Sequence, residues 1–506
     1  MNLFFEIDQK INLLKDDEII IFQTSKNNIK TQSYFINEIK NFEINSNNGW
    51  QKIIIDSYET FGMNFLGFGG AFTDSCGIIY NKLNDINKNL LIESYFSKSK
   101  GLKYEFGKVP IGSIDFSCRY NKDNKNNNKD KSCSFESSQY EYEKIELKEI
   151  NYNYDNSEEQ LKITMIQKSL EYNKNLNLIC SSWSAPKIMK SNGVLVKGSL
   201  NKIDYDIYCK YLIDFLNFYK NNGINFFGIS FQNEPIKRII GQNWQTMYFT
   251  KKEYKDFLNI FNSYLLNWNK NNLEYSTKLV LYDDQTDNLL NWTKYFLNNN
   301  EDVTKNTIAI AFHWYLNRFF GYDKISKTSE YLKNIDGGNI NLISSEACEG
   351  YLPLQNGVKI NNLGRGLSYG KDILECLKRG VNSWIDWNLF LNEKGGPNWI
   401  NRYVDAPIIV NSINGKIHYQ PTYFIIAHFS LFIEKNSKLV QINSKGPFPL
   451  ETVCFKTPKN KIVFIVLNRD ITGRKYFIYD KLREKYINLT INSRSIQTIV
   501  YNFIKK

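Results

Sequence analysis

Between residues 65 and 386, short apolar runs typical of β-strands alternate with amphipathic segments typical of helices. Eight such runs occur, at Phe65–Phe68, Tyr104–Pro110, Leu176–Cys180, Ile224–Phe231, Lys278–Tyr282, Thr307–Phe312, Asn341–Ser344 and Ser383–Asp386. Strands that are separated by a helix pair in parallel, and this alternation favours an α/β fold, a closed (β/α)8 TIM barrel, over a doubly wound sheet. No repeat of fixed period accompanies the runs, so the prediction depends on alternation alone.

Four of the intervening segments carry helical signals. The first spans Glu158–Tyr172, and the second, Tyr205–Asn222, places its large aromatic side chains on one stripe. A third opens with Thr250 three residues before Glu253, which is the capping-box pattern. The fourth spans Asp372–Arg379, and it is followed by a glycine, as is the second.

The two ends of the chain differ from the middle in their pattern of apolar residues. Residues 1–62 and 433–506 contain β-like runs such as Glu18–Phe22 and Lys461–Leu467, and no helical period is sustained in the first segment. We expect the two ends to combine into a β-sandwich accessory domain beside a catalytic barrel at residues 63–432. Domains of this size fit a chain of 506 residues.

Composition excludes several classes of protein. The net charge is +12, but the lysines are dispersed and no nucleic-acid motif occurs, so nucleic-acid binding is not expected. The tract Asn121–Lys131 is charged, of low complexity and expected to be a solvated loop. The eight cysteines lack metal-binding spacing and are expected to be reduced and buried. No signal peptide is seen in Met1–Asp8, and no apolar run approaches the roughly 18 residues of a membrane span, so we expect a soluble, cytoplasmic protein.

Two glutamates lie at equivalent positions of the predicted barrel. Glu234 follows the fourth strand and Glu346 follows the seventh, so both would face the mouth at the carboxyl ends of the strands. Either residue alone is more often an exposed loop residue. As a pair, one carboxyl can protonate a glycosidic oxygen while the other attacks the anomeric carbon, and a separation of about 5.5 Å or less gives a retaining hydrolase. Repulsion between the two is expected to raise the pKa of one.

Ten short motifs follow one another between residues 67 and 410. They are Gly67–Asp74, Val109–Ser117, Ser182–Pro186, Asn233–Pro235, Asp283–Gln285, His313–Tyr315, Ser345–Cys348, Trp384–Asn388, Gly395–Trp399 and Val404–Val410. In this order they resemble glycoside hydrolase family 30, and most closely its glucosylceramidase branch. The resemblance covers about residues 64–430, and the β-like ends fit the accessory sandwich of the family.

The resemblance implies a role for each candidate residue. Glu234 would be the acid/base and Glu346 the nucleophile. The glucose in the −1 site would be contacted by Asp115, Trp183, Asn233 and Trp387. His313 would lie near the two glutamates, and Trp314 and Tyr315 would line the mouth. The alternative for each aromatic residue is packing in the barrel, and for His313 a buried hydrogen-bonding role.

Two positions depart from the family pattern. Lys108 stands where the family has Arg, so the charge is kept but the planar fork that holds carboxylates is lost. Arg402 stands where the glucosylceramidase pattern has Asn, which leaves one sugar contact and the substrate specificity open.

The implied function is that of a retaining β-glucosidase of the glucosylceramidase type, which needs no metal or organic cofactor. Its partner would be a β-glucoside, with glucosylceramide at a membrane surface as one candidate. The alternatives are another family-30 activity, such as β-xylosidase or β-1,6-glucanase, and an inactive sugar-binding protein. The sequence leaves the aglycone, the pH optimum, any activator protein and the oligomeric state open.

Overall fold

The middle of the chain forms a closed parallel barrel. The computed structural model describes residue 4 and residues 7–26, 36–44, 51–61, 65–117, 159–238, 242–336, 338–446 and 450–504. The eight described barrel strands are β4 (Gly67–Ala71), β5 (Phe106–Ile111), β6 (Asn177–Ser182), β7 (Gly228–Ser230), β8 (Lys278–Gln285), β9 (Thr307–His313), β10 (Asn341–Glu346) and β11 (Ser383–Asp386). They pair in parallel in sequence order, and β11 closes the ring against β4. The predicted (β/α)8 barrel is therefore confirmed, with all eight predicted runs supplying a strand.

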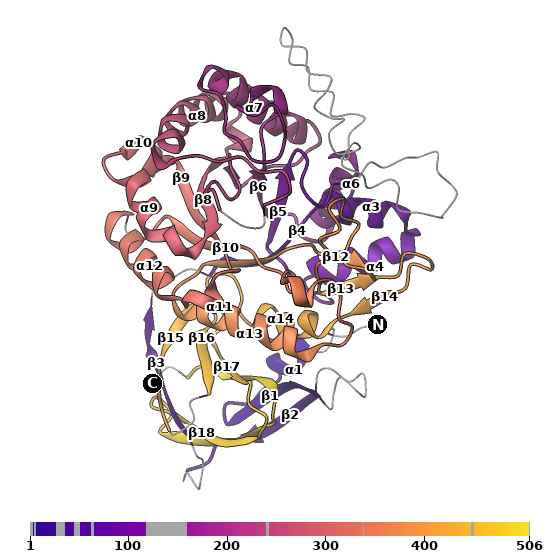
Figure 1. Ribbon diagram of the computed structural model, residues 1–506. Coiled ribbons are helices and arrows are strands. Elements are labelled where there is room, and N and C mark those ends of the chain that lie inside the picture. The colour runs from indigo at the N-terminus through magenta and orange to yellow at the C-terminus, as the bar shows by residue number, and fades with distance from the viewer. Residues whose placement is uncertain are drawn as a thin grey trace.

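Helices surround this barrel, as Figure 1 shows. They are α3 (Asp74–Lys82), α4 (Asp85–Phe96), α6 (Glu159–Tyr172), α7 (Tyr205–Asn221), α8 (Lys251–Asn271), α9 (Leu289–Leu297), α10 (Glu301–Asn306), α11 (Asn317–Phe320), α12 (Asp323–Asp336), α13 (Leu363–Lys378) and α14 (Pro421–Ser430). The capping box at the start of α8 forms as predicted, because the Thr250 side chain accepts from Glu253 N and the Glu253 side chain bonds back to Thr250 N.

One predicted helix was too short. The sequence pattern indicated Asp372–Arg379, whereas α13 begins at Leu363. Glycines at 366 and 370 lower helix propensity in the missed half. They are needed for packing, since a Cβ on Gly366 would lie 2.9 Å from the side chain of Ile425 in α14.

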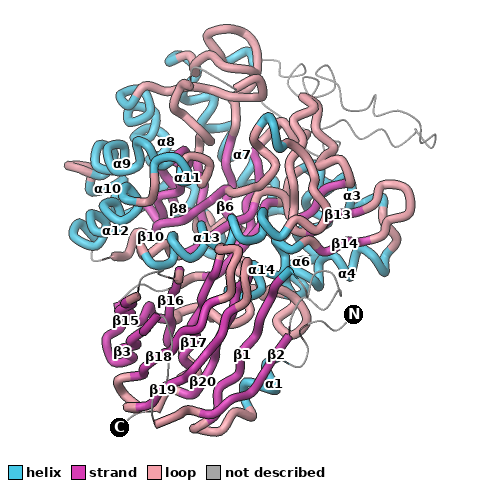
Figure 2. Tube along the Cα trace, turned by 60° about the horizontal axis from the view of Figure 1, so that its bottom comes forward, coloured by secondary structure: helices cyan, strands magenta, loops and turns pink. Residues whose placement is uncertain are grey.

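The two ends of the chain meet in a second sheet. Its nine described strands run in the order β19-β18-β3-β15-β16-β17-β20-β1-β2. Their bounds are β1 (Glu18–Ser25), β2 (Ile36–Asn41), β3 (Gln51–Phe61), β15 (Lys438–Lys445), β16 (Glu451–Lys456), β17 (Lys461–Asn468), β18 (Arg474–Asp480), β19 (Lys485–Ile491) and β20 (Ser495–Asn502). The N-terminal strand β3 thus lies between the C-terminal strands β18 and β15, and β1 pairs with the C-terminal strand β20, as Figure 2 shows. The expected accessory domain forms from both ends of the chain, while its exact boundaries stay a prediction.

The accessory domain is one sheet that curls on itself rather than two separate sheets. Its two edges meet where Glu43, just after β2, exchanges two backbone hydrogen bonds of 2.8 Å with Tyr486 of β19. Isoleucines 21, 53, 478 and 499 are among the buried residues that fill the inside. The other face packs on the barrel, where Phe22, Val463 and Ile465 join the main core together with residues of α13 and α14.

Four smaller points complete the fold. A short helix, α1 (Ile7–Asn12), lies in the segment that was expected to contain only β-structure, and it buries Ile7 and Ile11 one helical turn apart. The loop expected at 121–131 lies outside the described residues, as do Cys118 and Cys133. The six described cysteines are free and buried, as predicted. A three-stranded sheet of β12 (Phe390–Asn392), β13 (Ile408–Val410) and β14 (Ile417–Tyr419) was not predicted.

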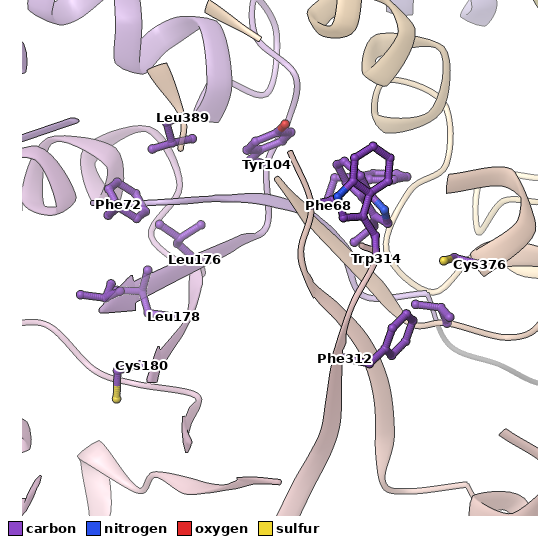
Figure 3. Packing of buried hydrophobic residues seen from close by; sticks show 14 of the residues in the cluster. Phe68, Phe72, Tyr104, Leu176, Leu178, Cys180, Phe312, Trp314, Cys376 and Leu389 are labelled. Carbon is purple, nitrogen blue, oxygen red and sulfur yellow. The ribbon is translucent and has the colours of Figure 1, made fainter. Parts of the chain in front are cut away.

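Figure 3 shows how the barrel strands pack outward. The side chains of Phe68 in β4, Leu178 and Cys180 in β6 and Phe312 in β9 are buried in the main core that the strands share with the surrounding helices. Residues at alternate positions therefore point into the barrel. That second set of side chains builds the site.

Candidate active site

The inner face of the barrel changes from apolar to polar toward the carboxyl ends of its strands. The apolar part is a separate buried cluster that includes Phe106, Ile179, Ala311, Ile343 and Ile385. Two residues further along the same five strands, the side chains are Lys108, Ser181, His313, Ser345 and Trp387. Because side chains two apart share one face of a strand, these groups converge at the mouth of the barrel.

Backbone irregularities aim the acidic residues at this mouth. The pairing of β10 with β9 shifts between Ser344 and Glu346, and the pairing of β8 with β9 shifts between Tyr282 and Asp284. Such bulges re-aim side chains at the rims of barrels. Glu234 also adopts a positive φ of 48°, and its N–H donates to the carbonyl of Asp283 at 2.9 Å. Strained conformations of this kind persist where the surrounding structure holds them, and they concentrate at functional sites.

Glu346 is held by donors on both of its carboxylate oxygens. Lys108 Nζ lies 3.2 Å from Oε2, and the hydroxyl of Tyr315 donates to Oε1 at 2.9 Å. Only 6% of Glu346 is exposed, so these contacts act with little screening by water. Hydrogen bonds in which the donor or the acceptor is charged are strong, so these two contacts fix the orientation of the Glu346 side chain.

Glu234 is hydrogen-bonded on one oxygen only. Gln285 Nε2 donates to Oε1 at 2.8 Å, and His313 Nδ1 lies 3.2 Å from the same atom. Among the described residues, none hydrogen-bonds to Oε2. Burial alone would raise the pKa of Glu234, but the hydrogen bond and charge of His313 outweigh burial and lower it. The expected rise of a pKa by repulsion within the pair is therefore wrong for Glu234 in the free protein.

Asp283 lies at the centre of the charge network. Its Oδ1 accepts from Lys108 Nζ at 3.2 Å and Ser345 Oγ at 2.6 Å, and Ser181 Oγ donates to Oδ2 at 2.5 Å. Burial opposes ionisation, but the charge of Lys108 and the hydrogen bond from His313 hold the pKa of Asp283 well below its usual range. Asp283 therefore stays a carboxylate that balances two buried cations.

His313 connects these carboxylates. Its Nε2 lies 3.2 Å from Asp283 Oδ1 and 3.8 Å from Glu346 Oε2, while Nδ1 faces Glu234. Burial lowers the pKa of His313, but the charge of Glu346 and the bonds to Asp283 and Glu234 raise it to about 10. The ring is thus an imidazolium that donates from both nitrogens.

The predicted sugar-contacting residues lie beside this network. Trp183 and Trp387 stack with their ring centroids 5.2 Å apart, and Lys108 Nζ lies 5.1 Å from the Trp183 ring. Asn233 Oδ1 accepts from Lys108 at 3.1 Å. Burial and the charge of Glu346 raise the pKa of Asp115 to about 7. The structure therefore brings Trp183, Trp387, Asn233 and Asp115 close to the two glutamates, and their roles stay predictions.

The two remaining aromatic candidates differ in position. Tyr315 contacts Glu346 directly, as given above. The Trp314 ring packs against Tyr369, with centroids 5.3 Å apart, and Figure 3 shows it near Phe312 among the core residues. We therefore place Tyr315 in the site and Trp314 behind it, and a sugar contact for Trp314 stays a prediction.

The two departures from the family pattern also have defined positions. Lys108 spans Asn233, Asp283 and Glu346, so its single ammonium supports the predicted nucleophile despite the loss of the planar fork. The guanidinium of Arg402 lies 4.7 Å from the centroid of the Trp244 ring, and its charge lowers the pKa of Asp115 against the effect of burial.

Sequence reasoning missed several members of the site. Asp283, Gln285, Ser181 and Ser345 were given no role, although they carry most of the hydrogen bonds around the glutamates. A signal was present, since Asp283 and Gln285 directly follow the fifth predicted strand. It was not decisive because a one-residue shift, such as the bulge in β8, exchanges inward and outward side chains.

The closed parallel barrel and the two carboxylates at the ends of its fourth and seventh strands define a glycoside hydrolase. Residues 65–433 match the glycosyl hydrolase family 30 TIM-barrel domain, and residues 436–499 match the glycosyl hydrolase family 30 beta sandwich domain. The chain therefore belongs to glycosyl hydrolase family 30.

Similar proteins cover most of the chain. Putative glucosylceramidase 3 of Caenorhabditis elegans is 33% identical over 457 residues, 89% of this chain and 82% of the relative. Lysosomal acid glucosylceramidase of Mus musculus is 32% identical over 412 residues, 80% and 74% of the two chains. The crystal structure of SrfJ from Salmonella typhimurium superposes with a TM-score of 0.78 at 23% identity, over 96% of this chain and 100% of SrfJ. Among the described residues, no helix is both long and apolar enough to cross a membrane.

Proposed function

We propose that this chain is a retaining β-glucosidase of the glucosylceramidase type. The proposal is supported by the two relatives named as glucosylceramidases, whose matches cover 89% and 80% of this chain. The site observation that carries it is the unequal environment of the two glutamates. Glu346 has donors on both oxygens, whereas Glu234 is bonded on Oε1 alone.

This difference assigns the two roles. A carboxylate whose two oxygens are held by a cation and a hydroxyl is fixed in orientation for attack on the anomeric carbon, which suits Glu346 as the nucleophile. The oxygen of Glu234 that receives no hydrogen bond from a described residue can carry a proton toward the leaving group. Glu234 is 8% exposed, and a bound glucoside that replaces the remaining water would raise its pKa in the complex.

The proposed reaction has two steps. In the first, Glu346 forms a bond to the anomeric carbon, the bond from that carbon to the glycosidic oxygen breaks, and Glu234 transfers its proton to the departing oxygen. In the second, the Glu234 carboxylate takes a proton from water as the water oxygen attacks the anomeric carbon. The ester bond to Glu346 breaks, and glucose leaves with its configuration retained.

The sugar is tested with 4-nitrophenyl β-glycosides that differ in the sugar alone. We expect kcat/KM for the β-glucoside to exceed that for the β-xyloside. A preference for the xyloside would instead favour the family-30 β-xylosidase alternative.

The aglycone is tested by comparing glucosylceramide in mixed micelles with a soluble β-1,6-glucan. An endo-1,6-β-D-glucanase of Neurospora crassa is 25% identical over 248 residues, 48% of this chain, a shorter and weaker match than those to the glucosylceramidases. We therefore expect release of glucose from the lipid and little from the glucan. The reverse result would assign the chain to the glucanases.

The last alternative is an inactive sugar-binding barrel. A cyclitol epoxide that mimics a β-glucoside should attach covalently to Glu346, and peptide mass spectrometry would locate the label. Absence of a label on any carboxylate, together with absence of turnover, would favour the inactive barrel.

A further inference from the structure

Lys190 is a buried lysine without an acidic partner. It is 3% exposed, and no carboxylate of the described residues forms a salt bridge with it. The other two buried lysines of the described residues differ, since Lys108 lies against Asp283 and Glu346, and Lys162 lies against Asp74 and Glu159. Burial lowers the pKa of Lys190 to about 7. Burying a charged amine without a carboxylate partner costs free energy. The hydrogen bonds of Lys190 go to neutral oxygens, so they do not form an ion pair, and a positioning role is the alternative.

The three hydrogen bonds of Lys190 join two loops. Its Nζ donates to Ser184 Oγ and to the carbonyl of Leu195, both in the loop between β6 and α7, at 2.7 Å each. It also donates to the carbonyl of Thr246, in the loop between β7 and α8, at 2.7 Å. In its protonated form the Lys190 amine has three donors and no acceptor, and these three oxygens satisfy all three donors.

Both loops reach the candidate active site. Ser184 directly follows Trp183, which stacks on Trp387. In the other loop Tyr248 is close enough to Glu234 for the charge of that carboxylate to add to burial in raising the pKa of Tyr248. One loop therefore carries a wall of the predicted sugar site, and the other lies beside the predicted acid/base.

A second contact extends the connection. Gln245, next to Thr246, donates from Nε2 to Ser113 Oγ at 3.1 Å and accepts from Trp399 Nε1 at 3.2 Å. Trp399 N in turn donates to the carbonyl of Asp115 at 3.2 Å. The connection from Lys190 thus runs through Thr246, Gln245 and Trp399 and ends at the backbone carbonyl of Asp115, the residue whose carboxylate is predicted to bind the sugar.

We propose that Lys190 is a positioning residue that holds the β6–α7 and β7–α8 loops together and so fixes Trp183 and, through Gln245, the segment that carries Asp115 for sugar binding. The predicted effect of Lys190 on turnover rests on the proposed function. The predicted effect of Lys190 on the two loops does not depend on any activity.

The kinetic test compares Lys190→Met with the wild-type protein on 4-nitrophenyl β-glucoside. The variant keeps the length of the side chain but loses all three donors. We expect KM to rise about tenfold while kcat stays within about threefold, because the loss falls on sugar positioning rather than on either glutamate. The matched control is Lys187→Met, which removes a more exposed ammonium from the same loop and should leave KM unchanged.

Gln245→Leu provides a second variant. If both residues act through one connection, KM of the double variant should be about that of the worse single variant rather than the product of the two effects. Fully multiplicative effects, or a wild-type KM for Lys190→Met, would overturn the proposal.

The structural test is amide hydrogen exchange of the full chain. In Lys190→Met, peptides covering residues 183–200 and 242–249 should exchange faster, while α8 keeps its protection. If Lys190→Met does not fold, the same measurement on Gln245→Leu should show faster exchange around 113–117 and 242–249, and unchanged exchange there would count against the connection. A wild-type protein that turns over no glucoside would remove the proposed function, but the exchange measurement would still decide the role of Lys190.

Discussion

Two histidines, one at the barrel mouth and one between barrel and sandwich, are completely buried and have opposite acid–base properties. His313 at the mouth has a pKa raised to about 10, whereas burial lowers the pKa of His428 in α14 to about 3. Burial penalises the imidazolium in both places. The difference therefore comes from the neighbours.

The neighbours of His428 are neutral. Its Nδ1 and Nε2 lie 2.9 Å from the hydroxyls of Thr498 and Thr24. Thr498 Oγ1 donates its proton to the His428 carbonyl at 2.9 Å, so the same oxygen accepts from Nδ1–H. Nε2 is then left as an acceptor for the Thr24 hydroxyl, which fixes one neutral tautomer. His428 is thus held by neutral groups, whereas His313 is held by the charged groups arranged around it at the mouth.

The largest effect is expected from removing the charge of the predicted nucleophile. Glu346→Gln should lower kcat for every β-glucoside by about 10⁴-fold or more, because the amide cannot form the glycosyl-enzyme. Initial rates on 4-nitrophenyl β-glucoside measure the effect. Glu349→Gln is the control, since Glu349 is also buried after β10 but pairs with Arg318 at 3.0 Å and should keep activity near wild type. Comparable losses in both variants would show that the loss reflects folding.

The next effect depends on the leaving group. Glu234→Gln should lower kcat/KM by roughly 10³-fold for an alkyl β-glucoside, whose alkoxide leaves poorly without a proton. A 2,4-dinitrophenyl β-glucoside needs no proton to leave, so a burst of dinitrophenol should survive. Rapid-mixing kinetics on the two substrates separate the steps. Equal losses on both substrates would exclude Glu234 as the acid.

The barrel could be predicted because its signal is local and repeated. Each strand run and the capping box at Thr250 are readable within a few residues, and Glu234 and Glu346 follow such runs directly. The first half of α13 was missed because Gly366 and Gly370 lower helix propensity and are explained only by the packing of α14, far along the chain.

The charge network could not be predicted in the same way. Asp283 becomes the partner of Lys108 and His313 through a bulge in β8, and no local pattern marks which residue of a strand will bulge. The lowered pKa of Glu234 likewise follows mainly from His313, which lies on another strand, β9. Sequence reasoning considered only the two glutamates, so it predicted repulsion where the structure has imidazolium between them.

A smaller effect is expected from Lys108, which stands where the family pattern has Arg. Lys108→Met removes one of the two cations that Asp283 and Glu346 share and leaves His313 as the other, so kcat should fall about 100-fold and stability by about 3–5 kcal/mol. Lys108→Arg keeps the charge and should recover most of kcat. Urea titration and initial rates measure the two quantities.

Lys162→Met is the matched control for this variant. Lys162 is as buried as Lys108 and also contacts two carboxylates, at 2.8 Å each, but it lies away from Glu346. The Lys162→Met variant should lose stability to a similar extent, but the molecules that remain folded should have the wild-type kcat. A low kcat in both variants would mean that Lys108 acts through folding rather than on the nucleophile.

The smallest effect tests the two histidines directly by the dependence of stability on pH. His428 has a folded pKa of about 3, below the unfolded value of about 6.5. Its stabilising contribution is therefore complete above pH 6.5 and is lost as the pH falls, by about 1.4 kcal/mol per unit.

His313, with a folded pKa of about 10, contributes fully below pH 6.5 and loses its contribution as the pH rises. The free energy of unfolding of His428→Gln should therefore rise by about 2 kcal/mol relative to that of the wild-type protein as the pH falls from 6.5 to 5. That of His313→Asn should rise by a similar amount relative to the wild-type protein as the pH increases from 6.5 to 8. Urea denaturation at the three pH values gives both differences. Parallel pH profiles for the wild-type protein and either variant would show that the neighbours of that histidine do not set its charge.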